Sequence, residues 1–406
     1  MMQMAAILWH VSLLAPPNQK GLALGLVGLV RVVPIVVFSL VGGVVADALD
    51  RRRLMLLTQS AMALFAVVLA LITFNGSASL SLLYVLTGLS SAAGSFDGPA
   101  RQSLLPTLVP RAQLPNAISL NTIMFQTAAV AGPTLAGLVI AGLGIGWVYA
   151  LNAVSFGAVI VAILLMRDVP KRVAGDRGEV NLRAAIEGLR FVFSSPLIRS
   201  SMILDFFATF FSSATVLLPI YAQDILVVGA KGYGWLYAAP SVGALATGAL
   251  MVHLVDRIEE RGRVLLWAVA CYGLATVGFG LSRDFGLAFF FLAVTGAADT
   301  VSMVFRNILR QLATPDALRG RMTSVNMVFF MGGPQLGEVE AGLVANWLGA
   351  PFAVVTGGLG CLAATAWIAA RAPELRRYRR EEGVSPVVSA PSRVGAGPEA
   401  QTPPPL

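Results

Sequence analysis

Charged side chains are scarce in this chain. They make up 12% of the 406 residues, hydrophobic residues make up 56%, and the mean hydropathy is +0.77. So small a polar fraction cannot cover the surface of a water-soluble globule of this length. A soluble enzyme or soluble binding domain is therefore excluded, and the chain is predicted to lie in a lipid bilayer.

Cysteine and histidine are also scarce, with two of each. Cys271 and Cys361 each lie inside an apolar run, where a single thiol packs as a small hydrophobic group, so neither a disulfide nor a metal site is indicated. His10 and His253 are far apart and have no ligand-like neighbours. The sequence also contains no phosphate-binding loop and no nucleophile paired with a base. It therefore predicts no enzyme, no ATP-driven pump and no cofactor.

The charge that is present is mainly basic, with 29 Lys and Arg against 21 Asp and Glu, a net charge of +8. These basic residues lie in short loops between apolar runs rather than in one patch. That distribution is typical of cytoplasmic loops of membrane proteins and argues against a nucleic-acid partner.

A long internal repeat divides the chain. Residues 101–121 return 205 residues later as residues 306–326, with an arginine at the first position and an asparagine at the last of each copy. The same shift places the segment AGLV at 136–139 on AGLV at 341–344. A repeat of half the chain length, in which a charged loop precedes an apolar run, predicts two similar membrane halves.

Apolar segments follow one another along both halves. A spanning helix needs about 20 residues. Residues 1–15 fall short of that and lack the flanks of a signal peptide, so we interpret them as the end of a first helix whose beginning precedes this sequence. The other spans are predicted at residues 22–46, 54–74, 80–100, 117–141, 147–166, 198–221, 233–255, 264–281, 285–305, 322–345 and 352–370.

The predicted fold is an all-α membrane protein with twelve helices. Its regions are an N-terminal six-helix bundle at 1–166, a cytoplasmic linker at 167–197, a C-terminal bundle at 198–370 and a disordered cytoplasmic tail at 371–406. Basic loops alternate with uncharged ones, which predicts that both termini are cytoplasmic. Apolar residues spaced along 182–193 favour an amphipathic helix on the inner leaflet, with a plain linker as the alternative.

This organisation resembles the major facilitator superfamily. Gly43, Asp47 and the basic cluster Arg51, Arg52 and Arg53 are similar to the signature of that family's loop between the second and third helices. Two positions depart from the signature: Ala48 stands where a basic residue is usual, and Asp50 where a glycine is usual.

Further segments resemble one branch of this superfamily. GLALGLVGLVRVVP, SFDGPARQSLLPTLVPR and LATPDALRGRM are similar to segments of the exporters that include the enterobactin exporter and drug efflux proteins. The resemblance implies two pseudo-twofold bundles, transport by alternating access, and second and eleventh helices that face each other across the halves.

Ionisable side chains within spans are candidates for function, because inserting each costs about 2.5–3.5 kcal/mol. Asp97 is predicted to pair with the basic cluster at 51–53 as a structural latch, with a proton site as the alternative. Asp47 is interpreted as a cytoplasmic gate element that interacts with the start of the helix near Met322.

An ion pair is predicted near the outer face, between Arg31 in the second span and Glu338 or Glu340 in the eleventh. Residues two apart on a helix point in different directions, so only one glutamate can face Arg31, and Glu338 is favoured. Protonation of the carboxylate would release the pair and open the outer side. The alternative is that both glutamates serve helix packing or snorkel outward.

Asp205 and Asp299 are the deepest carboxylates. Burial raises a carboxylate's pKa and a nearby positive charge lowers it, so a site that alternates between these surroundings can load and release a proton. Helix capping or an interhelical hydrogen bond is the alternative. Candidates for the substrate cavity, with plain packing as the alternative, are Asn121, Gln126, Asn326, Phe329, Phe330 and Gln335.

The sequence thus favours a proton-coupled secondary exporter of small amphipathic molecules, drug-like or siderophore-like, by antiport. It is expected to be a monomeric multi-pass protein of the cell membrane, with a small-molecule substrate, protons and lipid as partners. A channel, or a non-transporting sensor or assembly protein of the same fold, is the alternative, and these residues do not distinguish export from import.

Overall fold

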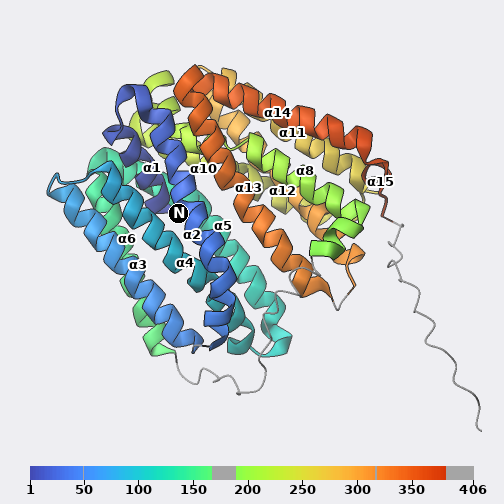
Figure 1. Cartoon of the computed structure of the whole chain (residues 1–406), viewed down its shortest axis with the longest axis horizontal. Coiled ribbons are helices and arrows are strands. Elements are labelled where there is room, and N and C mark those ends of the chain that lie inside the picture. The colour runs from blue at the N-terminus through green and yellow to red at the C-terminus, as the bar shows by residue number, and fades with distance from the viewer. Residues whose placement is uncertain (49, 167–188, 316–317, 381–406) are drawn as a thin grey trace, which may run out of the picture.

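The computed structural model is a bundle of long helices (Figure 1). It describes residues 1–48, 50–166, 189–315 and 318–380. The side chains of residues 39–48, and of several positions in the helices that contain residues 99–115 and 319–331, lie outside that description.

The N-terminal half contains six helices, and several of their ends are set by local signals. The Asp50 carboxylate accepts hydrogen bonds from the backbone N–H groups of Arg52 and Arg53 at 2.9 and 3.1 Å and so caps the third helix. Ser79 caps the fourth in the same way. The helices are α1 (Met2–Leu14), α2 (Lys20–Ala48), α3 (Arg51–Phe74), α4 (Leu80–Leu108), α5 (Leu114–Gly142) and α6 (Ile145–Leu165).

The C-terminal half begins with a helix that is broken. The sequence predicts one continuous span at 198–221, but α8 (Pro196–Phe211) ends at Ser212 and is followed by η3 (Ala214–Leu217), α9 (Leu218–Ile220) and a π-helical turn, η4 (Tyr221–Ile225). Pro219 has no N–H to donate, which accounts for a new start in this region. The remaining helices are α10 (Gly229–Leu254), α11 (Arg261–Leu281), α12 (Phe285–Ala313), α13 (Arg319–Leu348), α14 (Ala350–Arg371) and α15 (Pro373–Arg376).

Nine helices in the described part of the chain are long and apolar enough to cross a membrane. Three predicted spans are not among them. α1 has 13 residues, whereas α4 and α13 have 29 and 30 residues but contain charged side chains such as Asp97 and Glu338. With these three, the helices occupy the twelve predicted positions.

The two halves repeat one another in structure as well as in sequence. A shift of 205 residues carries the ends of α4 onto the ends of α12, and the start of α5 onto the start of α13. Packing repeats too: α2 packs on α4 as α10 packs on α12, α3 on α6 as α11 on α14, and α1 on α5 as α8 on α13. The halves meet where α2 packs on α13 and α5 on α10, again an equivalent pair. The pattern is that of a pseudo-twofold.

The seam between the halves is formed by backbone close to backbone. A Cβ atom added at Gly25 on α2 would lie 3.0 Å from the Gly342 Cα on α13, and one added at Gly137 on α5 would lie 2.8 Å from the Gly234 Cα on α10. These glycines lie toward the ends of the helices that are predicted to face outside. In Figure 1, α2 and α13 lie together at this end and diverge toward the other.

The linker and tail are described only in part. Residues 167–188, which hold most of the predicted surface helix, and residues 381–406 of the predicted tail lie outside the described residues, and residues 189–194 are helical. The first part of the tail corrects the prediction of disorder. α15 follows α14 and packs against α11, because Leu375 and Tyr378 are buried there.

Candidate functional site

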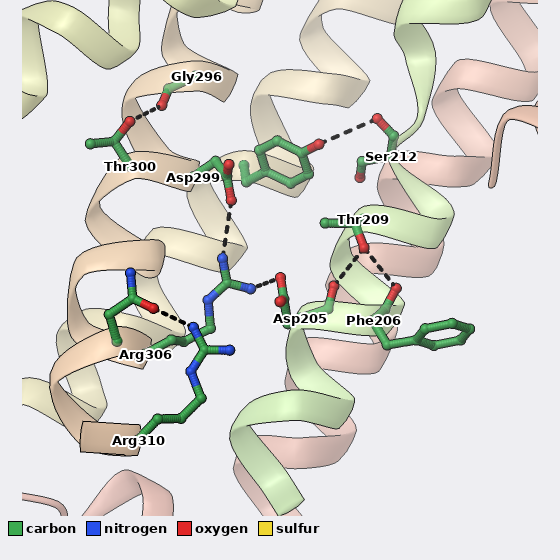
Figure 2. Close-up of polar contacts among 11 residues, drawn as sticks. Asp205, Phe206, Thr209, Ser212, Gly296, Asp299, Thr300, Arg306 and Arg310 are labelled. Atoms are coloured by element: carbon green, nitrogen blue, oxygen red, sulfur yellow. Dashed lines mark hydrogen bonds and ion pairs between the residues drawn. The ribbon is translucent and has the colours of Figure 1, made fainter. Parts of the chain in front are cut away.

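Two carboxylates and an arginine meet in the interior of the C-terminal half (Figure 2). Arg306 on α12 forms ion pairs with Asp205 on α8 and with Asp299 on α12, the latter at 3.3 Å. We call these three residues the carboxylate–arginine cluster. The two deepest carboxylates in the sequence are therefore brought together by one guanidinium.

Helical geometry explains how the cluster forms. Asp299 and Arg306 are seven residues apart, which is two turns, so they share one face of α12. That face turns toward α8, where Asp205 lies. The arginine and Asp205 are almost fully buried, whereas the Asp299 side chain is 49% exposed. Asp205 is thus the buried partner, and Asp299 is the more exposed carboxylate.

The position of Arg306 differs from the sequence-based expectation. The span was predicted to end at Phe305, with Arg306 in a cytoplasmic loop, but α12 continues to Ala313 and both Arg306 and Arg310 are buried. Arg310 donates to the Asn307 side chain at 2.5 Å. A hydropathy profile ends a span at a charged residue such as Arg306. Here that charge is neutralised by Asp205, about a hundred residues away in sequence, so the helix continues. The only local signal was the match of Arg306 to Arg101 in the repeat.

Aromatic rings lie on the helix next to the cluster. Phe206 stacks on Phe210 with ring centroids 5.8 Å apart and meets Phe329 of α13 edge to face at 6.1 Å. The Ser213 hydroxyl donates to the Pro334 carbonyl at 2.9 Å. Through these contacts α8 and the residues that follow it are fixed to α13, which packs on α2 at the seam.

A second charge pair crosses the seam itself. A guanidinium nitrogen of Arg31 on α2 lies 3.3 Å from a carboxylate oxygen of Glu338 on α13. Gly28 permits this approach, since a Cβ there would lie 2.8 Å from the Cβ of Glu338. Glu340 does not share the pair, and its Oε2 is buried without a hydrogen-bond partner among the described residues.

Further polar contacts join the halves at the outer rim and were not predicted from the sequence. Lys20 pairs with Asp224 at 2.9 Å, and the Ser12 hydroxyl donates to Gln223 at 3.1 Å. The Tyr233 hydroxyl donates to the Ala5 carbonyl at 2.9 Å. Gln223 and Asp224 belong to the π-helical turn, whose wider winding has no recognisable sequence pattern.

On the opposite side, the residues of the signature loop are partly described. Asp97 is buried and accepts hydrogen bonds from Thr58, Gln59 and Arg101, the last at 2.9 Å. Arg101 was predicted in a loop, but α4 continues to Leu108 and includes it. Arg52 donates to the carbonyl groups of Ile163 and Leu164 at the end of α6.

Three predicted site residues are not characterised by side-chain contacts. Gly43 and Asp47 lie in the last turns of α2 and Phe330 lies in α13, where the side chains are outside the described part. Among the other predicted cavity residues, Asn121 is exposed, Gln126, Asn326 and Phe329 are half-buried, and Gln335 is buried against α2.

The helices are arranged as in solved membrane proteins of the major facilitator fold. A solved structure of a bacterial homologue of the iron transporter ferroportin, in an inward-facing state, matches 93% of this chain and 96% of that chain with a TM-score of 0.68 and 16% identity. At this identity the likeness shows the fold alone. The packing of two equivalent six-helix halves described above agrees with it.

The chain belongs to the transmembrane secretion effector family, whose model matches residues 1–387. It is 31% identical to the multidrug efflux pump Tap of Mycolicibacterium fortuitum over 346 residues, which cover 82% of this chain and 83% of Tap. It is 28% identical to the enterobactin exporter EntS of Shigella boydii over 341 residues, 84% of this chain and 81% of EntS. The protein is a multi-pass membrane transporter with a small-molecule substrate, and it is not an enzyme.

Proposed function

We propose that this transporter is a proton-coupled exporter of small amphipathic molecules, and that the carboxylate–arginine cluster carries the proton. The observation that supports this most directly is the position of Arg306 between carboxylates of two different helices inside the bundle. The relatives named as an efflux pump and an exporter support the direction of transport.

The cluster has a charge of minus one when both carboxylates are ionised, and one proton makes it neutral. Asp299 is the carboxylate that takes this proton, because it is half-exposed and its contact with Arg306 is a single one at 3.3 Å. With Asp299 neutral, Arg306 pairs with Asp205 alone. With Asp299 ionised, the guanidinium is shared between Asp205 of α8 and Asp299 of its own helix. Each proton that enters from one side and leaves to the other thus changes how strongly α12 is held to α8.

The seam responds to this change because α8 packs on α13. Arg31 and Glu338 hold α2 to α13 on the side predicted to face outside, and the divergence of these helices at the other end corresponds to an inward-facing state. Export then requires the outer pair to break while the inner ends close. Asp47 and the basic residues at 51–53 act at that inner gate, and both termini lie on the cytoplasmic side. One chain contains both halves, so the transporting unit is a monomer.

The substrate binds between the halves, beside the rings of Phe206 and Phe329. Aromatic and amide groups there, with Gln126 and Asn326 on the equivalent helices α5 and α13, suit flat apolar molecules that carry a few polar groups.

Transport in inside-out membrane vesicles tests the proposal. We expect a fluorescent drug to accumulate when the vesicles acidify their interior, and an uncoupler to abolish accumulation. Asp299→Asn should abolish gradient-driven accumulation but retain drug-for-drug exchange without a gradient, because the neutral side chain mimics the protonated state. Asp284→Asn, in an outer turn, is the matched control and should behave as the original protein.

Two results would contradict the proposal in different ways. If uncoupler-sensitive accumulation survives in Asp299→Asn, the carboxylate–arginine cluster is not the site that carries the proton. If no uncoupler affects accumulation by the original protein, transport is not coupled to protons.

A further inference from the structure

A group of arginines surrounds a cavity at the end of the C-terminal half that is predicted to be cytoplasmic. The cavity has a volume of about 280 Å³. Its lining consists of Glu260, Arg263, Arg376, Arg377, Tyr378 and Arg379. We call this the arginine cavity. Four arginines and one glutamate give it a net charge of plus three.

The cavity is built by the chain segment that follows α14. This segment turns back onto α11, where the Gly262 N–H donates to the Tyr378 carbonyl and the Arg380 N–H donates to the Glu259 carbonyl, each at 3.0 Å. Leu375 and Tyr378 are buried beneath it. The arginines next to these anchors are therefore held in place rather than carried on a free tail.

The acidic residue neutralises only part of the charge. Glu260 pairs with Arg263 at 2.7 Å and with Arg379 at 3.3 Å. Arg376 and Arg377 are exposed, and within the described part of the chain no ion pair involves either of them. Among the described residues, nothing therefore neutralises these two guanidinium groups, which can bind an anion.

The depth of the cavity in the bilayer favours a lipid as the source of that anion. Arg263 lies in the first turn of the membrane-spanning helix α11, so it is at the level where a span leaves the hydrocarbon. Trp267, one turn further along the same face, is 74% exposed. Indole rings prefer the boundary between acyl chains and headgroups, and Arg side chains extend from there toward phosphate. A soluble anion has no acyl chain to contact this neighbouring apolar ring, whereas a lipid has one.

We propose that the arginine cavity binds the headgroup phosphate of an anionic phospholipid of the inner leaflet. Guanidinium groups bind phosphate oxygens in pairs, and juxtamembrane arginines attract anionic lipid. Arg376 and Arg377 hold the phosphate, and Trp267 contacts the acyl chains below it. This site is separate from the carboxylate–arginine cluster and does not depend on transport being proton-coupled.

Native mass spectrometry of the full chain in detergent, titrated with phosphatidylglycerol, measures this binding. The double variant Arg376→Gln, Arg377→Gln should bind the first phosphatidylglycerol about 30-fold more weakly. The control Lys231→Gln, Arg283→Gln removes two exposed charges from the opposite end and should bind normally. Phosphatidylcholine should bind equally weakly to all three proteins, and inorganic phosphate at millimolar concentration should not displace phosphatidylglycerol.

Equal affinity of the double variant and the control for phosphatidylglycerol would overturn the assignment. Displacement by inorganic phosphate would show a free-anion site instead and would also overturn it. If the glutamine variant aggregates, the double variant Arg376→Lys, Arg377→Lys replaces it. Lysine keeps the charge and loses only the bidentate part of the binding. Its affinity for phosphatidylglycerol should lie between that of the original protein and that expected for the glutamine variant.

Discussion

Single charged residues in this protein are placed by partners that are distant in sequence. Arg306 is buried because Asp205 neutralises it, and Arg31, whose side chain is 25% exposed, is held at the seam by Glu338. Removal of one member of a buried pair leaves an unpaired charge and costs about 3–5 kcal/mol. The exposed pair of Lys20 and Asp224 is worth about 0–1 kcal/mol. The two kinds of pair therefore differ in how strongly they stabilise the structure.

Sequence reasoning could identify these residues but only some of their partners. Arg31 and Glu338 were predictable, since depth along the second and eleventh spans puts them at the same level. Arg306 was not, because a local hydropathy window counts its charge without the carboxylate that compensates it. Thr58 and Gln59 were missed as partners of Asp97 for a similar reason: their polar groups appear unremarkable until α3 and α4 pack together.

A charge swap tests the pair across the seam. Arg31→Glu and Glu338→Arg, made singly, should each reduce drug efflux by about tenfold or more, because each places two like charges within 4 Å of each other. The double variant restores opposite charges and should recover much of the efflux. Glu340→Gln is the control and should change efflux little. A double variant no more active than the single ones would refute the pair's role.

The cap of α3 gives a prediction about stability. Asp50→Ala removes two hydrogen bonds to the first turn and should lower the free energy of unfolding by about 1 kcal/mol, whereas Asp50→Gly should cost only a few tenths. Chemical unfolding in mixed micelles, followed by circular dichroism, measures both. Glu259→Ala, at an exposed turn, serves as the control. Equal effects of Ala and Gly at position 50 would argue against capping.

Whole helices were predicted better than their ends. The existence and order of the helices followed from apolar runs, and the 205-residue repeat matched α4 with α12 and α5 with α13. The break after α8 was not predicted, because the residues on both sides of Ser212 are mostly apolar and no period distinguishes a continuous helix from an interrupted one. The docking of α15 was missed since Leu375 and Tyr378 are too few to form a detectable pattern.

Close approach of α2 and α13 yields a prediction at the scale of these helices. Gly25→Leu places a branched side chain where even a Cβ atom would lie 3.0 Å from the Gly342 Cα, so the outer ends of the helices must separate. Spin labels at Ser77 and Arg283, in outer turns of the two halves, should report a longer distance by pulsed electron resonance.

Gly157→Leu on α6 is the matched control for that experiment, because nothing lies within 4 Å of a Cβ added there. Its label distance should equal that of the original protein. An unchanged distance in Gly25→Leu would mean that the seam adapts by local rearrangement rather than by separation of the halves.

Over the whole molecule, the halves are related by a pseudo-twofold, and each half is internally well packed. α2 with α13 and α5 with α10 are the helix pairs that join them. Within each half the helix packing repeats, with α2 on α4 as α10 on α12 and α3 on α6 as α11 on α14. This repeated packing is the physical basis for treating each half as a unit during transport.

Cross-linking tests that motion. In a protein whose two native cysteines are replaced by alanine, Ser12→Cys with Gln223→Cys joins the halves at the outer rim, where these side chains are 3.1 Å apart. A short bifunctional thiol reagent should abolish efflux, and cleavage of the link should restore it. Ser200→Cys with Glu374→Cys, also 3.1 Å apart but both in the C-terminal half, should tolerate the same reagent. Full efflux with the outer link in place would exclude relative motion of the halves there.

The glycine contacts between α2 and α13 have one more consequence. Where the main chains meet at these glycines, few side chains interlock, so separation of the two helices there requires few side-chain rearrangements. The barrier to separation is then concentrated in the ionic links across the seam, so exchange of one of those charges is expected to change the rate of transport while leaving the architecture intact.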